Sequence, residues 1–523
     1  MSEIESFWGW GWAHRFPDDE ARLQLGQLVQ GLTGFAPRGL LSPPTLAQVE
    51  LTTPRGPSPA FDFVRSDPEA RIRHCYGKSY PDQLRGFRGD YSAAPDRVAT
   101  PRGEVDIERI LEFASASQLA VVPFGGGTSV TGGIECRGEG HAGVLSLDLG
   151  HLDRVLEVDP IARLARIQAG AKGPALEAQL GAQGYTLRHF PQSFEHSTLG
   201  GWVATRAGGH FATVYTHIDD LVASTRMITP RGLWATRTLP ASGAGPAPDR
   251  LVLGSEGTLG VITEATVRIR PRPGHRAGAT LLYDRFEAGV EAARALAQSG
   301  LHPSNCRLLD PREALLFGVN AENKAVLIVG FEAAHHPVEV DLARALELLR
   351  DFGGELRPAA VDDGAGRWKQ AFFDAPYLQS TLISLGLLAD TFETCCTWST
   401  FPTLHAALVK GVREALKRTT GGAFLSCRFT HVYPDGPAPY YTFVGPAPVG
   451  GELAAWQEVK HTACEILAQH GATITHHHAV GRTHRPWYRR EVPPLFTGAL
   501  WEVKRHLDPA GIMNPGVLWE IGR

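Results

Sequence analysis

The sequence lacks any apolar run long enough to cross a membrane. Its longest apolar stretch, Ala325–Phe331, has the length of a single strand. The first residues, Met1 to Pro17, carry several tryptophans but no basic region followed by an apolar one, so no secretory signal peptide is expected. These absences favour a cytoplasmic protein that makes at most peripheral contact with a membrane.

Cysteine is also scarce, and neither sign of charge is in large excess. The seven cysteines are dispersed and form no C-x-x-C pair, which is typical of reduced thiols and does not fit a disulfide framework or a zinc site. Because 51 Lys and Arg oppose 55 Asp and Glu, the net charge is only −4. No basic surface for a nucleic acid is therefore indicated.

Glycine and proline, in contrast, are abundant, with 58 and 37 of the 523 residues. This exceeds their usual joint share of about 12%. The excess excludes a helical bundle or a coiled coil, and it indicates many tight turns and close backbone approaches. A chain of this length is beyond the size at which single cores stop growing, so we expect two or more domains.

The hydrophobic pattern predicts an α+β protein with mixed sheets. Composition changes divide it into a helical and irregular region over 1–90, a glycine-rich strand region over 91–275, alternating helices and strands over 276–450, and a C-terminal segment over 451–523. Helices are predicted over 20–32, 174–183, 286–296, 338–352, 404–417, 453–469 and 495–507. Strands are predicted over 120–124, 144–149, 155–159, 164–169, 267–269, 325–331, 425–431, 440–444 and 474–480.

The most informative segment is Val121–Gly133, in which a buried strand runs into VVPFGGGTSVTGG. Glycines let consecutive backbone N–H groups approach an anion, so we expect a phosphate or pyrophosphate ligand. A P-loop is excluded because no lysine follows, and the G-x-G-x-x-G fingerprint fails because Val130 replaces its third glycine. Two further segments rich in Gly, Ser and Thr, at 191–209 and 254–263, suggest that all three line one extended cofactor.

These three segments resemble the FAD-binding domain of the vanillyl-alcohol oxidase and p-cresol methylhydroxylase superfamily. Within it, the chain is most similar to the alkylglycerone-phosphate synthase (alkyl-dihydroxyacetonephosphate synthase) family. The resemblance covers nearly the whole chain, and its further motifs are WGWG at 8–11, RLLD at 307–310, FET at 392–394, CR at 427–428, HHHAVG at 476–481 and NPG at 514–516.

The resemblance implies a fold as well as a cofactor. It implies a PCMH-type FAD-binding domain of two α+β subdomains over 91–275, a cap domain over 276–450 with a sheet flanked by helices, and a segment over 451–523 that returns the His triplet to the flavin. Covalently flavinylated relatives carry a His where this chain has Gly127, so non-covalent FAD is expected. The expected FAD contacts are Pro123, Phe124, Gly125, Gly126, Gly127, Thr128, Ser129, Gln192, Ser193, Ser197, Thr198, Gly201, Thr205, Ala207, Gly208, Glu256, Gly257, Thr258, Leu259, Gly260, Val261 and Ile262.

The triplet His476–His478 is the main candidate for chemistry, because imidazoles are well suited to proton transfer near neutral pH. In a strand over 474–480, a period of two would place His476 and His478 on one face and His477 on the other. The resemblance implies that the triplet is needed for activity. We therefore expect His477 to be the general base and its two neighbours to orient it.

Two further catalytic residues are implied by the resemblance. The family has a catalytic tyrosine shortly after an Asp-Gly turn, and Tyr440 falls at that place. Tyr441 alternates to the opposite face and is expected in the core. Arg307 matches an arginine that supports the active-site histidine and cofactor binding.

No metal is expected. Flavin D-2-hydroxyacid dehydrogenases hold a metal with two histidines around a Gly-Asp-Gly-Asn turn and with the glutamate of a Gly-Glu-His-Gly motif. Here His431 is retained, but Tyr440 replaces the second histidine and His477 replaces the glutamate. A divalent ion prefers a pre-arranged set of His and carboxylate ligands, and this set is dismantled.

Gln379 and Arg428 are the residues expected to meet the substrate. Synthases of the family carry a substrate-binding arginine shortly before FET, where this chain has Gln379. An amide gives only neutral hydrogen bonds, so its presence should weaken binding of a phosphate-bearing ketone by roughly 1.5–3 kcal/mol. Either another basic residue compensates, or the substrate lacks that phosphate.

The implied activity belongs to ether lipid synthesis. His477 would remove a C1 proton from acyl-dihydroxyacetone phosphate, and a fatty alcohol would replace the acyl chain without net redox. The alternative, favoured by Gln379, is an FAD-dependent oxidase or dehydrogenase of an alcohol or 2-hydroxy acid. A non-catalytic flavoprotein that binds a partner is disfavoured, because it has no need of proton-transfer groups. The expected partner is a small-molecule or lipid substrate, and the resemblance implies a homodimer.

Overall fold

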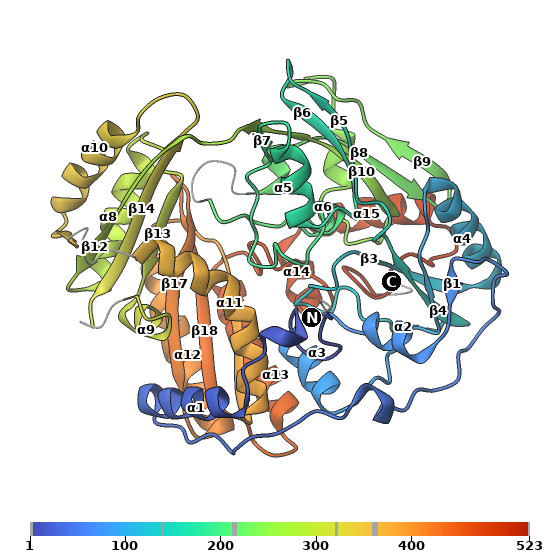
Figure 1. Ribbon diagram of the computed structural model, residues 1–523, viewed down its shortest axis with the longest axis horizontal. Helices are drawn as coiled ribbons and strands as arrows, with labels where there is room; N and C mark the ends of the chain where they lie inside the picture. The colour runs from blue at the N-terminus through green and yellow to red at the C-terminus, as the bar shows by residue number, and fades with distance from the viewer. Residues whose placement is uncertain (1–3, 139, 212–216, 320–322, 358–363, 521–523) are drawn as a thin grey trace.

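The computed structural model describes residues 4–138, 140–211, 217–319, 323–357 and 364–520, with the backbone alone over 364–372. The chain forms two halves (Figure 1). One half, on the right of the view, contains two sheets built from residues before 270 and the three glycine-rich segments, and we call it the cofactor half. The other, on the left, contains a seven-stranded sheet with its helices, and we call it the cap.

The first sheet of the cofactor half has the order β1–β2–β4–β3. Its strands are β1 (Val64–Arg65), β2 (Arg97–Ala99), β4 (Gly143–Asp148) and β3 (Leu119–Phe124). The last three are parallel, and helix α4 (Glu104–Ser117) packs its buried face in the same core. A distant segment joins this sheet beside β3. The N–H of Val121 donates to the carbonyl of Ile512, and the N–H of Asn514 donates to the carbonyl of Val121, each at 2.8 Å.

The second sheet is antiparallel and has the order β5–β6–β10–β8–β9. Its strands are β5 (Val155–Asp159), β6 (Leu164–Gln168), β10 (Val261–Arg268), β8 (Val222–Thr229) and β9 (Gly232–Ala235). The helices of this half are α2 (Pro68–Arg73), α5 (Gly173–Gly181), α6 (Leu199–Thr205), α7 (Ile218–Leu221), α14 (Arg485–Glu491) and α15 (Pro494–Leu507), and β7 (Tyr185–Thr186) pairs with β11 (Arg270–Pro271). One apolar core contains residues of both sheets, so the two α+β subdomains pack as a unit.

The cap sheet is antiparallel, in the order β15–β12–β14–β13–β17–β18–β16. Its strands are β15 (Glu355–Leu356), β12 (His275–Tyr283), β14 (Ala325–Ala333), β13 (Asn305–Leu309), β17 (Phe424–Val432), β18 (Pro437–Pro446) and β16 (Leu387–Glu393). One face packs on α8 (Phe286–Gln298), α10 (Glu339–Arg350), α12 (Phe401–Thr420) and α13 (Glu452–Gln469). The other meets α1 (Asp19–Thr33), α9 (Pro311–Leu316) and α11 (Gly364–Ser384).

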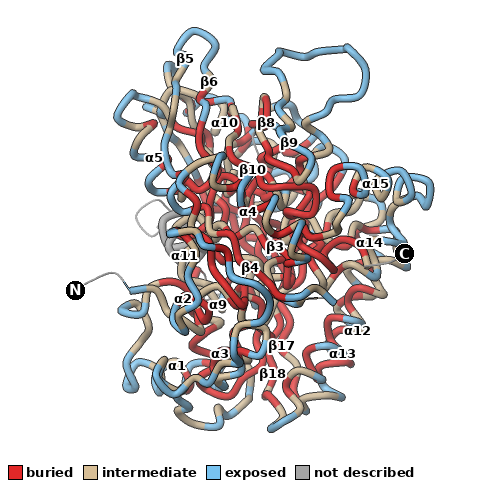
Figure 2. Tube along the Cα trace, turned by 90° about the vertical axis from the view of Figure 1, so that its right-hand side faces the viewer, coloured by how far each residue is buried: buried red, intermediate tan, exposed pale blue. Residues whose placement is uncertain are grey.

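Alternation along β18 separates two neighbouring tyrosines. Tyr440 lines the large cavity between the halves, whereas Tyr441 is fully buried among the helices, where its ring stacks on Phe392. The expectation that Tyr441 belongs to the core is therefore confirmed. Figure 2 shows how burial varies along the chain: the sheets run through the buried interior, and the tip of the β5–β6 hairpin is exposed.

Most of the predicted helices and strands are confirmed, including the β5–β6 hairpin and helix α13. The strand predicted over 267–269 is the end of the longer β10. The strand predicted over 474–480 is wrong, because that segment is an irregular loop whose N–H groups donate to buried carboxylates and not to a neighbouring strand. None of the helices in the described part of the chain has the length and hydropathy of a membrane span.

The first glycine-rich loop packs directly on the second. A Cβ on Gly126 would lie 1.9 Å from the carbonyl oxygen of His196, and a Cβ on Gly125 would lie 2.4 Å from the hydroxyl of Thr198. Gly127 adopts φ = +67°, in the left-handed region. These glycines are therefore needed for contact between two loops of the protein, in addition to any contact with a ligand.

We predict that Gly126→Ala lowers the melting temperature and the bound flavin content together, because backbone atoms at 1.9 and 2.7 Å must shift to admit the methyl group. Gly31→Ala is the matched control. Gly31 lies in helix α1 with nothing near its Cβ position, so this change should be neutral or stabilising, by up to about 1 kcal/mol. Circular dichroism melts and flavin absorbance provide the measurements. Equal behaviour of the two variants would contradict the loop-packing role.

Candidate active site

A large cavity lies between the three glycine-rich segments and the cap sheet. Its lining includes the expected FAD contacts Pro123, Phe124, Gly125, Gly126, Gly127, Thr128, Ser129, Gln192, Ser193, Ser197, Thr198, Gly201, Thr205, Ala207, Gly208, Glu256, Gly257, Gly260 and Ile262. Thr258, Leu259 and Val261 are not part of the lining. They are buried, and the Thr258 hydroxyl donates to the carbonyl of Ser255.

The first loop offers the donors that an anionic cofactor needs. Among the described residues, no acceptor receives a hydrogen bond from any backbone N–H between Gly125 and Thr131. Buried or half-buried N–H groups are normally paired, so a run of free donors along a cavity wall indicates a ligand with several acceptor oxygens. The pyrophosphate of FAD meets this requirement, and the residues present therefore fit FAD.

Glu393, the last residue of β16, organises the histidine loop. Its carboxylate accepts the backbone N–H of His476 at 2.7 Å, of His477 at 3.2 Å and of His478 at 3.1 Å. The hydroxyl of Thr475 donates to the same carboxylate at 2.6 Å. Consecutive N–H groups that converge on an anion form a nest, which is why this segment bends into a loop.

A second buried carboxylate holds the other end of the loop. Glu256, from the third glycine-rich segment, accepts the N–H groups of Val480 and Gly481, both at 2.9 Å. Burial raises the pKa of Glu256 to about 7, and the two N–H bonds oppose that rise. The side chain of Asn514 donates to the Glu256 carbonyl at 2.7 Å. The loop is thus tied to the cap at one end and to the cofactor half at the other.

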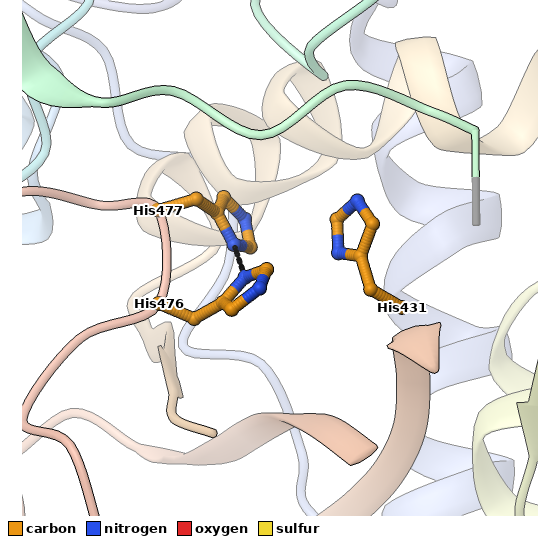
Figure 3. A group of neighbouring side chains, drawn as sticks. All are labelled: His431, His476 and His477. Carbon is orange, nitrogen blue, oxygen red and sulfur yellow. Dashed lines mark hydrogen bonds between the residues drawn. The ribbon is translucent and has the colours of Figure 1, made fainter. Parts of the chain in front are cut away.

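The imidazoles of the loop form a hydrogen-bonded chain. Figure 3 shows the rings of His476 and His477 in contact, with His431 facing them. Nδ1 of His476 lies 2.9 Å from Nδ1 of His477, and Nε2 of His476 lies 3.1 Å from Nε2 of His217. At the end of the chain, Nδ1 of His217 lies 3.2 Å from the carbonyl oxygen of Arg206.

When the imidazoles are neutral, a chain that ends at this carbonyl runs in one direction, and the Tyr433 hydroxyl, which lies 2.7 Å from Nε2 of His476, accepts from that nitrogen together with His217. A carbonyl only accepts, so His217 carries its proton on Nδ1 and accepts at Nε2 from His476. His476 then accepts at Nδ1 from Nδ1–H of His477. The remaining nitrogen of His477, Nε2, holds the lone pair that can take a proton. His477 and His478 line the cavity, whereas His476 does not.

Burial sets the charge state of this cluster. It lowers the pKa of His477, an effect that the Glu393 carboxylate opposes, and it lowers the pKa of His476 and His478 well below the ordinary value. Burial alone would raise the pKa of Glu393, but the imidazoles, His477 first, and the Thr475 hydroxyl bring it well below its usual range. Near neutral pH the site therefore places neutral bases beside a carboxylate anion.

The same imidazoles meet the distance requirement of a metal site, because nitrogen atoms of His431, His476 and His477 lie within 4.8 Å of one another. At least one nitrogen of each ring is already engaged, however. Nε2 of His431 lies 2.6 Å from the carbonyl of Gly209, and Nδ1 of His476 bonds to Nδ1 of His477. An ion would compete with these bonds, so a metal-free site stays our prediction.

The register of the cap sheet aligns its polar side chains in one row. Glu393 pairs with Tyr440 across β16 and β18, and Tyr440 pairs with Arg428 across β18 and β17. The Tyr440 hydroxyl donates to Oγ1 of Thr391 at 2.9 Å, and the guanidinium carbon of Arg428 lies 3.9 Å from the tyrosine ring centroid. Arg428 also forms an ion pair with the buried Glu313. Burial raises the pKa of Tyr440, so its hydroxyl stays a donor near neutral pH.

Arg307, on β13, is placed behind the cavity wall. It is 1% exposed and does not line the cavity. Its Nη2 donates to the carbonyl of His210 and lies 3.2 Å from the Nδ1 of that residue. Burial, and then the positive charge of Arg428, lower the pKa of Arg307 to about 9. Its hydrogen-bond partner is His210, and its positive charge adds to the effect of burial in lowering the pKa of His477.

Gln379, on α11, lines the cavity beside the free edge of β16. Its Nε2 donates to the carbonyl of Ala389 at 3.0 Å and to the carboxylate of Asp390 at 3.1 Å. Its Oε1 accepts from Gln83, on helix α3 (Tyr80–Phe87), at 2.8 Å. Both ends of the amide are therefore used to cross-link the protein.

Three residues of the site have no role in the sequence-based prediction: Glu393, His217 and Lys460. Glu393 lies within the FET motif, at the end of the mostly apolar strand β16. A carboxylate at the end of such a strand could have indicated a functional residue. His217 and Lys460 carry no local signal, because only the fold brings them to the site. Lys460, on α13, lines the cavity and donates to the carbonyl of Thr391 at 2.8 Å.

Comparison with known families agrees with this architecture. An FAD-binding domain matches residues 95–236, and the C-terminal domain of FAD-linked oxidases matches residues 272–518. An alkyldihydroxyacetonephosphate synthase of Trypanosoma brucei brucei is 30% identical over 484 residues, which cover 87% of this chain and 78% of the relative. A solved alkyldihydroxyacetonephosphate synthase superposes with a TM-score of 0.83 at 26% identity and covers 98% of each chain. Substrate-bound p-cresol methylhydroxylase shares the fold, with a TM-score of 0.69 at 13% identity, over 88% of this chain and 95% of its own.

The fold, the glycine-rich cradle and these matches define an FAD-dependent enzyme with a PCMH-type FAD-binding domain and a cap. Within that class, the chain belongs to the alkyldihydroxyacetonephosphate synthase family.

We predict that Glu393→Gln lowers kcat by about 10²-fold or more while FAD remains bound. An amide presents its NH₂ group to three backbone N–H donors, so the nest loses charged hydrogen bonds of roughly 1.5–3 kcal/mol each. Glu347→Gln, which removes an exposed carboxylate on helix α10 of the cap, is the control. Steady-state turnover and flavin absorbance distinguish the outcomes, and a Glu393→Gln enzyme with normal kcat would contradict the organising role.

We also predict that the acid limb of the pH–rate profile lies below pH 6.5. A base must be neutral to act, and a pKa lowered by burial keeps His477 neutral to more acidic pH. The profile of kcat/KM between pH 4.5 and 8 gives the measurement. An acid limb centred above pH 6.5 would mean that His477 is not the titrating base.

Proposed function

We propose that this enzyme exchanges the acyl chain of acyl-dihydroxyacetone phosphate for a fatty alcohol. The acyl chain leaves as a carboxylate, the alkyl ether forms at the same carbon, and no net redox occurs. The observation that carries the proposal is the position of His477, which a carboxylate-bound loop holds at a cavity shared with the FAD-binding segments and whose Nδ1 is engaged by His476, so that Nε2 is left for the substrate. Membership of the synthase family supports the choice of substrate.

The roles of the side chains follow from their positions. His477 Nε2 takes the proton from C1 of the substrate, and the Glu393 carboxylate stabilises the imidazolium that results. The chain through His476 to His217 lets that positive charge pass away from the reacting carbon. The Tyr440 hydroxyl donates to a substrate oxygen.

FAD bound to the glycine-rich segments supplies the electrophilic centre that stabilises the reacting carbon. Non-covalent binding is supported by Gly127, because a glycine has no side chain to attach the cofactor. Arg428 packs its guanidinium on the face of the Tyr440 ring and so orients that ring. Its charge is balanced by the carboxylate of Glu313. We further propose a cytoplasmic location, supported by the dispersed and unpaired cysteines, and a homodimer, for which family resemblance is the support.

One observation favours a second function. Position 379 carries no guanidinium, and the Gln379 amide is occupied by protein groups. A substrate without phosphate, such as an alcohol or a 2-hydroxy acid, would not need that charge. In this alternative the flavin would be reduced, and His477 would take the hydroxyl proton, either directly or through the Tyr440 hydroxyl acting as a relay.

Anaerobic incubation of the holoenzyme distinguishes the two functions. Incorporation of a labelled fatty alcohol into acyl-dihydroxyacetone phosphate, with the flavin spectrum still oxidised at the end, would establish the exchange. Bleaching of the flavin by a hydroxy acid or an alcohol, with no incorporation, would establish the oxidoreductase and overturn our proposal. Both reactions are run with and without a chelator to test the metal-free prediction.

We predict that His477→Ala retains FAD but loses about 10²–10⁴-fold in the rate of exchange, the usual contribution of a general base. His506→Ala, which removes an exposed imidazole on α15, should leave the rate unchanged. Turnover is measured by release of the labelled carboxylate. Unaltered turnover in His477→Ala would refute the assigned role.

A further inference from the structure

Lys460 is a buried cation that forms no ion pair with any carboxylate of the described residues. It is 7% exposed, and its ammonium donates one hydrogen bond, to the Thr391 carbonyl at 2.8 Å. Among the described residues, no carboxylate lies within 4.0 Å of it, and its other two N–H bonds have no acceptor. An uncompensated buried charge is costly, so such a group indicates an anionic ligand.

Lys504 shows what a structural buried lysine looks like in the same molecule. It is 4% exposed and donates to three acceptors, namely the carboxylate of Asp508 and the carbonyls of Thr258 and Met513. All of its N–H bonds are satisfied within the protein. Lys460 differs in two respects, since it lacks a carboxylate and it lines the large cavity.

Lys460 is held at the same strand edge as position 379, where the guanidinium of the family is missing. β16 is the edge strand of the cap sheet, so its outward carbonyls are available to side chains. Gln379, from α11, donates to the carbonyl of Ala389, and Lys460, from α13, donates to the carbonyl of Thr391. Carbonyls two residues apart on a strand point the same way and lie about 7 Å apart. A basic group on either helix therefore reaches the same part of the cavity.

This part of the cavity adjoins the reacting groups. Thr391, whose carbonyl receives Lys460, accepts from the Tyr440 hydroxyl with its own side chain. The Tyr440 ring in turn packs in parallel with the His477 imidazole, with ring centroids 6.1 Å apart. An anionic group held by Lys460 would thus lie close to Thr391, which contacts Tyr440, and Tyr440 in turn packs on His477.

We propose that Lys460 binds the phosphate group of the substrate and replaces the arginine that position 379 lacks. The inference rests on the proposed function, which it deepens by naming the residue that recognises the phosphate. The ammonium has two free N–H bonds, and a phosphate has oxygens enough to accept both. The absence of a guanidinium at position 379 then no longer argues against a phosphate-bearing substrate.

The test is a binding titration of the holoenzyme with dihydroxyacetone phosphate and with dihydroxyacetone, followed by calorimetry and by perturbation of the flavin spectrum. The variants are Lys460→Met, which keeps the aliphatic stem, Lys460→Arg, which keeps the charge, and Lys410→Met, which removes an exposed lysine on α12. Melting temperature and flavin content of each variant show that fold and cofactor are retained.

We expect Lys460→Met to weaken binding of dihydroxyacetone phosphate by about tenfold to a hundredfold and to leave binding of dihydroxyacetone unchanged. Lys460→Arg should restore most of the affinity, and Lys410→Met should behave as the wild type. Equal affinity of wild type and Lys460→Met for the phosphorylated ligand would overturn the inference, as would an equal loss for both ligands.

The two proposals fail in distinguishable ways. If the wild type binds dihydroxyacetone phosphate through Lys460 but does not exchange fatty alcohol, the anion site stands and the proposed function fails. If exchange proceeds and Lys460→Met has an unchanged KM for acyl-dihydroxyacetone phosphate, the function stands and the anion site fails.

Discussion

The carboxylate of Glu393 is the interaction on which the candidate site depends. Burying an anion is costly, and here the cost is offset by three consecutive backbone N–H groups and a hydroxyl. The same bonds determine the conformation of the histidine loop, because the N–H groups cannot reach the carboxylate from an extended strand. The conformation in turn determines which imidazole nitrogens meet. One buried charge therefore sets the backbone shape of the loop and the basicity of its imidazoles, while the Arg206 carbonyl sets their tautomers.

The cap contributes to the site through the register of its strands. Glu393, Arg428 and Tyr440 come from three different strands, and cross-strand pairing aligns them on one face beside the cavity. At the edge of the sheet, two helices approach from opposite sides and each places a polar side chain on a β16 carbonyl. The sheet thus provides a rigid wall of the cavity, and the side chains that α11 and α13 place at its edge determine which ligand is bound. Because the wall does not depend on those side chains, a substitution such as Gln379 leaves the surrounding geometry intact.

Sequence reasoning succeeded where function is encoded in consecutive residues. The three glycine-rich segments indicated one extended cofactor with phosphate groups, the family resemblance implied that it is FAD, and most of those residues line the cavity. It failed at residues 474–480, where period-two alternation suggested a strand but a distant glutamate captured the N–H groups. Lys460 could not be predicted, because on a helix it is indistinguishable from any solvated lysine. Lys460 can be recognised as part of the site only in the folded structure, where α13 packs at the edge of β16.

The pairing of Val121 with Ile512 and Asn514 has a consequence for how the protein is made. During synthesis, strand β3 leaves the ribosome long before residues 512–514 exist. Asn514 also bonds to the carbonyls of Gly133 and Glu256, which border the cofactor loops. The cradle therefore stays incomplete throughout most of translation, and the nascent chain acquires its full set of flavin contacts only after the cap has emerged and had time to fold.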